Sequence, residues 1–225
     1  MTRDEQKRAV AAAAVAYVTP GTIIGVGTGS TVARFIEELV ARPELVAATV
    51  ASSEASAAAL RAAGIPVVRL DEAPSLPLYV DGADEVDPAL RLIKGAGGAL
   101  AREKVLASAA ALFVCIVDES KLVERLGVAP VPLAVLPMAT TLVAQRVRSL
   151  GGRPVTRIGY RSDDGAAILD VAGLDLSDPE RLEAELDAIP GVVECGIFAR
   201  RRADVVLAGT SAGVRTLGRP GVTPA

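Results

Sequence analysis

Short apolar runs alternate with helix-forming segments over the first half of the chain, and this feature constrains the fold most strongly. Segments with apolar residues at three- and four-residue spacing predict helices, and short runs rich in Val, Ile and Leu predict buried strands. Strands that alternate with helices in this way form a mostly parallel, Rossmann-like α/β sheet with helices on both faces. The predicted strands cover 22–27, 46–52, 65–71, 77–84 and 112–120, and the predicted helices cover 2–18, 30–42, 53–64 and 98–111.

A proline-rich segment at 127–137 marks a domain boundary, because it holds three prolines in eleven residues. Beyond it the order becomes strand-helix-strand-strand-helix-strand, with a hairpin signal "DDG" at 163–165. This order is typical of a ferredoxin-like α+β domain. The sequence therefore predicts a discontinuous α/β catalytic domain over 1–128 and 203–218, an inserted ferredoxin-like domain over 129–202 and a C-terminal tail over 219–225.

Composition excludes several classes of function. The chain of 225 residues has no histidine, which rules out Ser–His or Cys–His nucleophile pairs and His-ligated metals. A net charge of −3 and an aromatic content of 3% give little support to nucleic-acid binding. No apolar run approaches the ~20 residues of a spanning helix, and the start does not resemble a signal peptide. We expect a cytoplasmic protein that binds neither nucleic acid nor membrane.

The segment "GVGTGST", from Gly25 to Thr31, lies between a predicted strand and a predicted helix. Its glycines allow a ligand to approach the backbone, and the helix that follows offers free N–H groups and the positive end of its dipole. The hydroxyl groups of Ser30 and Thr31 add donors. The segment fits either a phosphate-binding loop or a tight turn with a Ser/Thr cap.

The segment "DGADEVD" brings Asp81, Asp84 and Glu85 together directly after a predicted strand. Ligands of open α/β sheets bind at this end of the strands. Three interpretations remain open: a solvated acidic loop, a site for Mg²⁺ or Ca²⁺, and a set of acids that hydrogen-bond a polyol.

A third segment, "IKGAGGALAREK", joins Lys94 through a glycine-rich turn to Glu103 in the early part of a helix. A carboxylate base next to a cation and free N–H groups suits proton abstraction beside a carbonyl, although Glu103 could also serve only the helix dipole. Lys121 follows the next strand, and Lys7 lies on an apolar helix stripe from which it could reach an anion. If the strand ends meet at one edge, this mixture fits a small phosphorylated polyol.

These segments together resemble type A ribose-5-phosphate isomerase. The resemblance extends over roughly residues 4–217 and rests on motifs in a fixed order. The motifs are "GVGTGST", "SSEAS", "YVDGADEVD", "IKGAGGALAREK", "DESKLVERLG", "PVPLAVLP", "LGGRP" and "AIPGVVECGIFARRRADVVLAGT".

The resemblance implies a metal-independent aldose–ketose isomerase of the pentose phosphate pathway that needs no cofactor and forms a homodimer or tetramer. It assigns Glu103 as the general base. We expect Asp81 and Asp84 to hydrogen-bond sugar hydroxyls, with Asp81 helping to open the ring and Lys94 balancing the charge. The residues expected to contact substrate are Lys7, Thr28, Gly29, Ser30, Thr31, Asp81, Gly82, Ala83, Asp84, Lys94, Gly95, Ala96, Gly97 and Lys121.

Two departures from the family pattern affect details of the predicted site. Ala96 stands where a third glycine is usual, which would cost about 1 kcal/mol if the position required a positive φ. The segment "FARRRAD", 198–204, replaces a more usual Asn-Arg-Gly-Ala-Asp. Two alternatives also remain: a non-catalytic sugar-phosphate sensor, or an isomerase of another phosphosugar. The sensor is disfavoured because the single predicted helix before the phosphate loop leaves no room for a DNA-binding helix pair.

Overall fold

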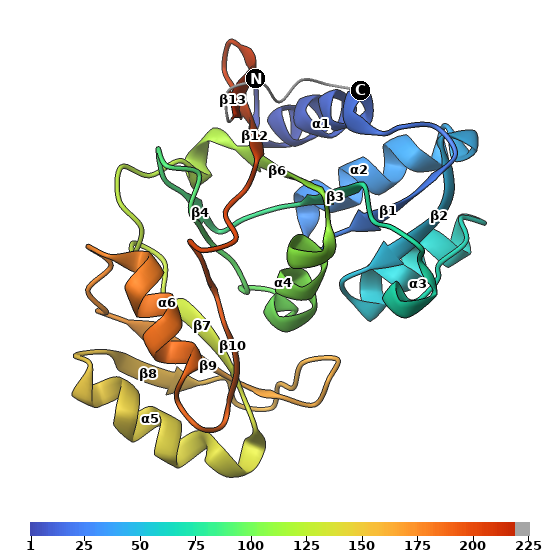
Figure 1. Cartoon of the computed structure of the whole chain (residues 1–225). Coiled ribbons are helices and arrows are strands. Elements are labelled where there is room, and N and C mark those ends of the chain that lie inside the picture. Colours follow the sequence, from blue (N-terminus) through green and yellow to red (C-terminus); the bar gives the residue numbers. More distant parts are fainter. Residues whose placement is uncertain (219–225) are drawn as a thin grey trace. The chain divides into compact units, whose positions relative to one another are not determined.

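The computed structural model describes residues 1–218, so the predicted tail at 219–225 lies outside the described residues. The chain forms two compact units (Figure 1). The first contains residues 1–82, 105–122 and, among the described residues, 203–218. The second contains residues 83–104 and 123–202.

The first unit is built on a six-stranded sheet in the order β13-β12-β6-β3-β1-β2. β13 runs antiparallel to β12, and the other neighbouring pairs are parallel. This is the mostly parallel sheet that the sequence predicts. The strands are β1 (Thr22–Val26), β2 (Val46–Ala51), β3 (Leu78–Asp81), β6 (Leu112–Asp118), β12 (Val205–Thr210) and β13 (Gly213–Gly218).

Helices complete the first unit, and α1 and α2 lie side by side over the sheet (Figure 1). Their apolar residues, such as Val10 and Phe35, pack against strand residues such as Ile24 and Val114 in one buried core. A capping box of Thr2 and Glu5 is present at the start of α1. The helices are α1 (Arg3–Ala14), η1 (Val15–Tyr17), α2 (Ser30–Val40), η2 (Pro43–Leu45), α3 (Glu54–Ala62), η3 (Leu70–Glu72), α4 (Leu100–Ala109, whose first residues belong to the second unit) and η4 (Glu119–Lys121).

Two details of the first unit differ from the prediction. The expected strand over 65–71 is reduced to one bridge between Val67 and Thr49, because the chain turns into η3 immediately afterwards. The edge strand β13 was not predicted, since most of its residues are exposed and it lacks an apolar pattern. No helix within residues 1–218 is long and apolar enough to cross a membrane.

The second unit holds a four-stranded antiparallel sheet in the order β10-β7-β9-β8. Its helices α5 and α6 cover one face of this sheet (Figure 1), where Val143 and Leu186 pack with Leu133 and Leu169. The strand-helix-strand-strand-helix-strand order is the predicted ferredoxin-like pattern. The elements are β7 (Val131–Val135), η5 (Pro137–Ala139), α5 (Thr140–Ser149), β8 (Arg153–Thr156), β9 (Ala167–Ala172), α6 (Pro179–Asp187) and β10 (Val192–Cys195).

A small antiparallel sheet, in the order β11-β5-β4, also belongs to the second unit. It comprises β4 (Glu85–Val86), β5 (Leu92–Ile93) and β11 (Ile197–Phe198). This pairing explains why residues 83–104 pack with the second unit, although the predicted boundaries place them in the first domain. The carboxylate of Glu85 strengthens the attachment, because it accepts hydrogen bonds from the N–H groups of Gly127 and Ala129.

Candidate active site

In the first unit, the carboxyl ends of three neighbouring parallel strands lead to predicted site residues. β1 leads to the loop 27–31, β3 ends at Asp81, and β6 leads through Asp118 to Lys121 in η4. Because β1 pairs with β3 and β3 with β6 in parallel, these ends lie at the same edge of the sheet. Three of the four segments expected to converge therefore do so at one edge of this sheet, whereas the segment of Lys94 and Glu103 follows β5 of a different sheet.

The loop after β1, residues 27–31, has the features of an anion site. Gly29 adopts a φ of 104°, which favours glycine, and it precedes the first turn of α2. Gly29 is the N-cap residue of α2, and among residues 1–218 no side-chain capping hydrogen bond is found at this position. The positive end of the helix dipole is therefore available to a ligand. Lys7 reaches the loop from α1 and donates from Nζ to Ser30 Oγ at 2.8 Å.

Asp81 is fully buried at the end of β3, and donors of the first unit surround its carboxylate. Oδ1 accepts the N–H groups of Thr28 at 3.0 Å and Gly82 at 2.7 Å. The hydroxyl of Tyr79 donates to Oδ2. The N–H of Thr28 is thus directed at Asp81, which leaves the donors from Gly29 onward for an anion.

Two serines that sequence analysis did not single out support the same loop. Ser53, the N-cap of α3, donates from Oγ to Thr28 Oγ1 at 3.1 Å. Ser56 donates from Oγ to the carbonyl oxygen of Gly27 at 2.7 Å. Both belong to "SSEAS", whose composition signals a helix cap, so a local pattern identifies the cap but not its partner.

In the second unit, Lys94 and Glu103 form a buried ion pair with 3.3 Å between Nζ and Oε2. The two residues are only 2% and 3% exposed. The backbone N–H of Lys94 donates to the carbonyl of Gly196, and Glu103 lies in the first turn of α4. Burial of two charges is unfavourable unless they are paired, so this arrangement keeps a carboxylate and a cation together in a site of low polarity.

The glycine-rich turn between Lys94 and Glu103 contacts Asp84. The N–H of Ala96 in this turn donates a hydrogen bond to Oδ2 of Asp84 at 2.9 Å. Gly95 and Gly98 have φ values of 107° and 78°. Among residues 1–218, Leu90 is the one non-glycine residue with a positive φ, so the φ of Ala96 is not positive. Alanine at position 96 is therefore accommodated without backbone strain. The departure at Ala96 therefore leaves the turn intact.

Two residues that sequence analysis missed hold this turn from the hairpin region. Arg157 donates to the carbonyl oxygens of Gly95 and Ala96 and pairs with Asp170. Tyr160 donates to the carbonyl of Gly97 at 2.8 Å. No sequence signal connects them to the turn, because they lie about 60 residues away in the chain.

A second buried ion cluster lies beside Glu103, around Lys104. Its Nζ lies 2.8 Å from carboxylate oxygens of both Glu183 and Glu194, and 4.7 Å from the ring centre of Phe198. Lys94 contacts the same ring at 5.5 Å. Burial opposes the charge of Lys104, but the carboxylates of Glu194 and Glu183 outweigh it and raise the pKa of Lys104 above its ordinary value.

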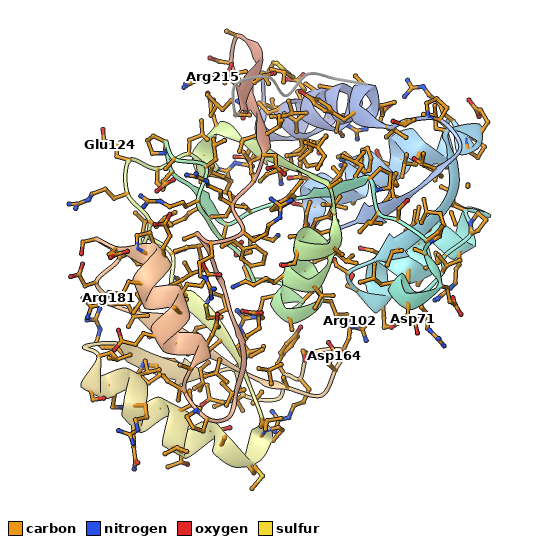
Figure 2. All side chains as sticks on the ribbon, in the orientation of Figure 1. Asp71, Arg102, Glu124, Asp164, Arg181 and Arg215 are labelled. Carbon is orange, nitrogen blue, oxygen red and sulfur yellow. The ribbon has the colours of Figure 1, made fainter. Side chains whose placement is uncertain are left out.

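On the exposed side of α4, Arg102 pairs with Asp164 of the hairpin turn at 2.8 Å (Figure 2). Both side chains are about one third or more exposed, in contrast to Lys104 one position later. The first turn of α4 thus carries a surface ion pair and a buried one in adjacent positions.

Within residues 1–218, three potential metal ligands come together at Asp187, Glu194 and Cys195, with ligand atoms within 4.8 Å of one another. This cluster does not favour a cation. The ammonium group of Lys104 already forms an ion pair with the Glu194 carboxylate. Burial also raises the pKa of the Cys195 thiol, which disfavours the thiolate that binds metals.

The predicted site residues are divided between the two units. The first unit contains Lys7, Thr28–Thr31, Asp81, Gly82 and Lys121. The second unit contains Ala83, Asp84, Lys94–Gly97 and Glu103.

Comparison with known proteins identifies the family. Residues 48–213 match the family model of ribose 5-phosphate isomerase A, also called phosphoriboisomerase A. The crystal structure of ribose 5-phosphate isomerase A from Neisseria gonorrhoeae is 46% identical with a TM-score of 0.94, and the match covers 96% of this chain and 97% of that one.

Two further structures agree with this match. The enzyme of Methanocaldococcus jannaschii is 40% identical with a TM-score of 0.92, over 97% of this chain and 100% of that one. A D-ribose-5-phosphate isomerase in complex with phospho-erythronic acid is 38% identical with a TM-score of 0.93, again over 97% and 100%. With these matches, the chain belongs to the ribose 5-phosphate isomerase A family.

Proposed function

We propose that this chain interconverts D-ribose 5-phosphate and D-ribulose 5-phosphate by proton transfer through an enediolate, without a metal. The observation that carries the mechanism is the buried pair of Lys94 and Glu103, 3.3 Å apart. A carboxylate beside a cation in a water-poor site is the arrangement that proton abstraction next to a carbonyl requires.

In the proposed reaction, Glu103 removes the proton from C2 of the open-chain aldose. The electrons of the C2–H bond form the C1–C2 double bond, and the carbonyl oxygen becomes an oxyanion that the ammonium group of Lys94 stabilises. Glu103 then returns the proton to C1, the hydroxyl proton of O2 passes to the oxyanion at O1, and the carbonyl forms at C2. The overall change moves one carbon-bound proton and one hydroxyl proton, and it consumes no redox partner.

The phosphate group is assigned to the loop 27–31 of the first unit, with Lys7 as an additional cation. Gly29, the open start of α2 and the hydroxyl groups of Ser30 and Thr31 suit a dianion. A similar structure contains phospho-erythronic acid, a phosphorylated sugar acid, and this supports a sugar phosphate as the ligand. We assign Asp84 to sugar hydroxyl groups, because its carboxylate is only partly buried.

A coupled assay tests this proposal on chelator-treated protein with ribose 5-phosphate, free ribose and arabinose 5-phosphate as substrates. We expect turnover of ribose 5-phosphate that chelation leaves unchanged. Free ribose should show about 10²-fold or more lower kcat/KM, because the charge-assisted contacts to the phosphate are lost. Arabinose 5-phosphate, which differs at C2, should not be turned over.

Three results would contradict the proposal in different ways. Binding of ribose 5-phosphate without turnover would favour the sugar-phosphate sensor, and preferential turnover of arabinose 5-phosphate would favour another phosphosugar. Loss of activity on chelation, restored by Mg²⁺ or Mn²⁺, would favour a metal site at the acidic segment. The pentose phosphate pathway and the homo-oligomer stay predictions from the resemblance, and the cytoplasmic location stays a prediction from the composition. Light scattering of the purified protein would test the homo-oligomer.

A further inference from the structure

The guanidinium group of Arg157 connects the antiparallel sheet of the second unit to the glycine-rich turn that follows Lys94. Its Nε and Nη2 donate to the two carboxylate oxygens of Asp170 in β9, both at 2.6 Å. Nη1 donates to the carbonyl oxygen of Ala96 at 2.9 Å, and Nη2 donates also to that of Gly95 at 3.1 Å. A bidentate pair fixes the plane of a guanidinium group, so Asp170 sets the direction in which Arg157 presents its donors to the turn.

These contacts determine which way the peptide groups of the turn face. The peptide bonds among the described residues are trans, and in a trans peptide the N–H points away from the carbonyl of the preceding residue. Because two successive carbonyls face Arg157, the N–H groups of Ala96 and Gly97 face the opposite side. The N–H of Ala96 donates there to Oδ2 of Asp84 at 2.9 Å, and among the described residues no acceptor is found for the N–H of Gly97, which is exposed. Arg157 thus directs an N–H donor toward the side of the carboxylate that the proposed function assigns to sugar hydroxyl groups.

Tyr160 holds the next carbonyl of the turn. Its hydroxyl donates to the carbonyl oxygen of Gly97 at 2.8 Å, and the guanidinium carbon of Arg157 lies 5.7 Å from the centre of its ring. Gly98 leaves room for this contact, because a methyl group at that position would overlap the tyrosine hydroxyl. The segment 157–160 therefore holds three successive carbonyls of the turn.

The same connection between β8 and β9 is tied to the helix that carries Glu103. Asp164 pairs with Arg102 at 2.8 Å, one position before Glu103 in the first turn of α4 (Figure 2). The connection therefore contacts both the turn after Lys94 and the helix turn of Glu103. Its position bears on the spacing of the two groups to which the proposed function assigns proton transfer.

We propose that Arg157 is a positioning residue of the isomerase, held by Asp170, and that it orients the glycine-rich turn so that its N–H groups face the sugar. The inference deepens the proposed function and rests on it, because it takes the sugar to lie at this turn. It gives the antiparallel sheet of the second unit a task in the reaction besides packing. Arg157 does not touch the substrate in this proposal, so its effect is on the placement of the groups that do.

Two ligands separate the two ends of the proposed site. Inorganic phosphate probes the loop 27–31 alone. Phospho-erythronic acid adds hydroxyl groups and a planar carboxylate, whose oxygens and negative charge resemble those of the enediolate. Calorimetry on the full-length protein gives the Kd of each ligand, and steady-state kinetics with ribose 5-phosphate give kcat and KM.

Arg157→Met removes all the donors of the side chain but keeps its apolar stem. We expect kcat to fall about 10- to 100-fold, since small displacements of reacting groups cost this much. The Kd of phospho-erythronic acid should rise about tenfold, and that of inorganic phosphate should stay within about twofold. Arg153→Met, which removes an exposed arginine of β8, is the control and should change none of these values.

A second variant separates positioning from stability. Arg157→Met leaves Asp170 without this cation, so the double variant Arg157→Met/Asp170→Asn removes both charges and should recover most of the lost Tm. We expect kcat of the double variant to stay about 10- to 100-fold low, because the carbonyls of the turn are still not held. Recovery of kcat together with Tm would show a merely structural role and overturn the inference. Tyr160→Phe tests the turn even if neither variant folds, with kcat expected about three- to tenfold lower and little change in Tm.

The remaining outcomes also decide. Wild-type kcat in Arg157→Met, or in Tyr160→Phe where only that variant folds, would refute the positioning role, and so would equal weakening of both ligands in Arg157→Met. A wild-type protein that binds phospho-erythronic acid no more tightly than inorganic phosphate would also contradict it, because the sugar would then gain nothing from the turn. Binding of both ligands without turnover of ribose 5-phosphate would refute the proposed reaction alone, because the comparison of the two Kd values needs no catalysis.

Discussion

Asp81 in the first unit and Glu103 in the second are both buried carboxylates, and the donors found on Asp81 differ in kind from the cation found beside Glu103. Neutral donors, two N–H groups and a tyrosine hydroxyl, surround Asp81. Glu103 faces the ammonium group of Lys94 at 3.3 Å. Backbone and hydroxyl dipoles thus help to satisfy Asp81, and the charge of Lys94 helps to satisfy Glu103.

This difference indicates what each carboxylate can do. Neutral donors in a close-packed setting fix the orientation of a carboxylate and transmit that orientation to the backbone that supplies them. A neighbouring ammonium group adds a charge that can stabilise an oxyanion when the carboxylate takes up a proton. The comparison supports the proposal that Glu103 transfers the proton.

The strongest test of this comparison is Glu103→Gln, which keeps the size of the side chain but cannot accept the proton. We expect kcat with ribose 5-phosphate to fall about 10²- to 10⁴-fold, the usual contribution of a general base. KM should change little, since the substrate contacts are retained. Steady-state kinetics beside Asp81→Asn provide the contrast. Equal losses of kcat in the two variants would remove the distinction between the carboxylates.

The next test concerns the dependence of the second unit on buried charge. Lys104→Met should lower the free energy of unfolding by about 3–5 kcal/mol, because Glu183 and Glu194 would lose their buried cation. Arg102→Met removes an exposed ion pair from the same helix turn and should change the free energy by about 0–1 kcal/mol. Urea unfolding measures both. Similar values for the two variants would show that burial does not matter here.

The sign of the pH dependence follows from the raised pKa of Lys104. A lysine whose pKa is higher in the folded than in the unfolded state stabilises the protein fully below its ordinary pKa of 10.5. That contribution is lost as the pH rises through the folded pKa. The difference between wild type and Lys104→Met should therefore persist at neutral pH and shrink only in strong alkali.

The smallest effect is expected at the edge of the phosphate loop. Lys7→Ala removes a partly exposed cation 2.8 Å from Ser30 Oγ, and KM for ribose 5-phosphate should rise about fivefold at low salt with kcat unchanged. Salt should reduce the effect by screening. Arg8→Ala, which removes the next cation of α1, serves as the control. A Lys7→Ala effect that is insensitive to salt would mean that Lys7 acts through packing rather than charge.

The sequence by itself determined the order of the main elements and the segments that carry the site. Helix and strand periodicities are local, so the parallel sheet of the first unit and the strand-helix-strand-strand-helix-strand order of the second could be predicted. The motifs with Thr28, Asp81, Lys94 and Glu103 could be found because glycine-rich turns and charged strand ends leave local signals.

Only the tertiary structure decided which groups meet. β4, β5 and β11 have two residues each, too few to show a period, so the transfer of residues 83–104 to the second unit depends on pairing with a segment about a hundred positions later. The contact of Asp81 with Thr28 spans 53 positions, and that of Lys104 with Glu183 spans 79. Such contacts depend on how buried polar groups find partners in the packed chain, and local sequence patterns do not contain that information.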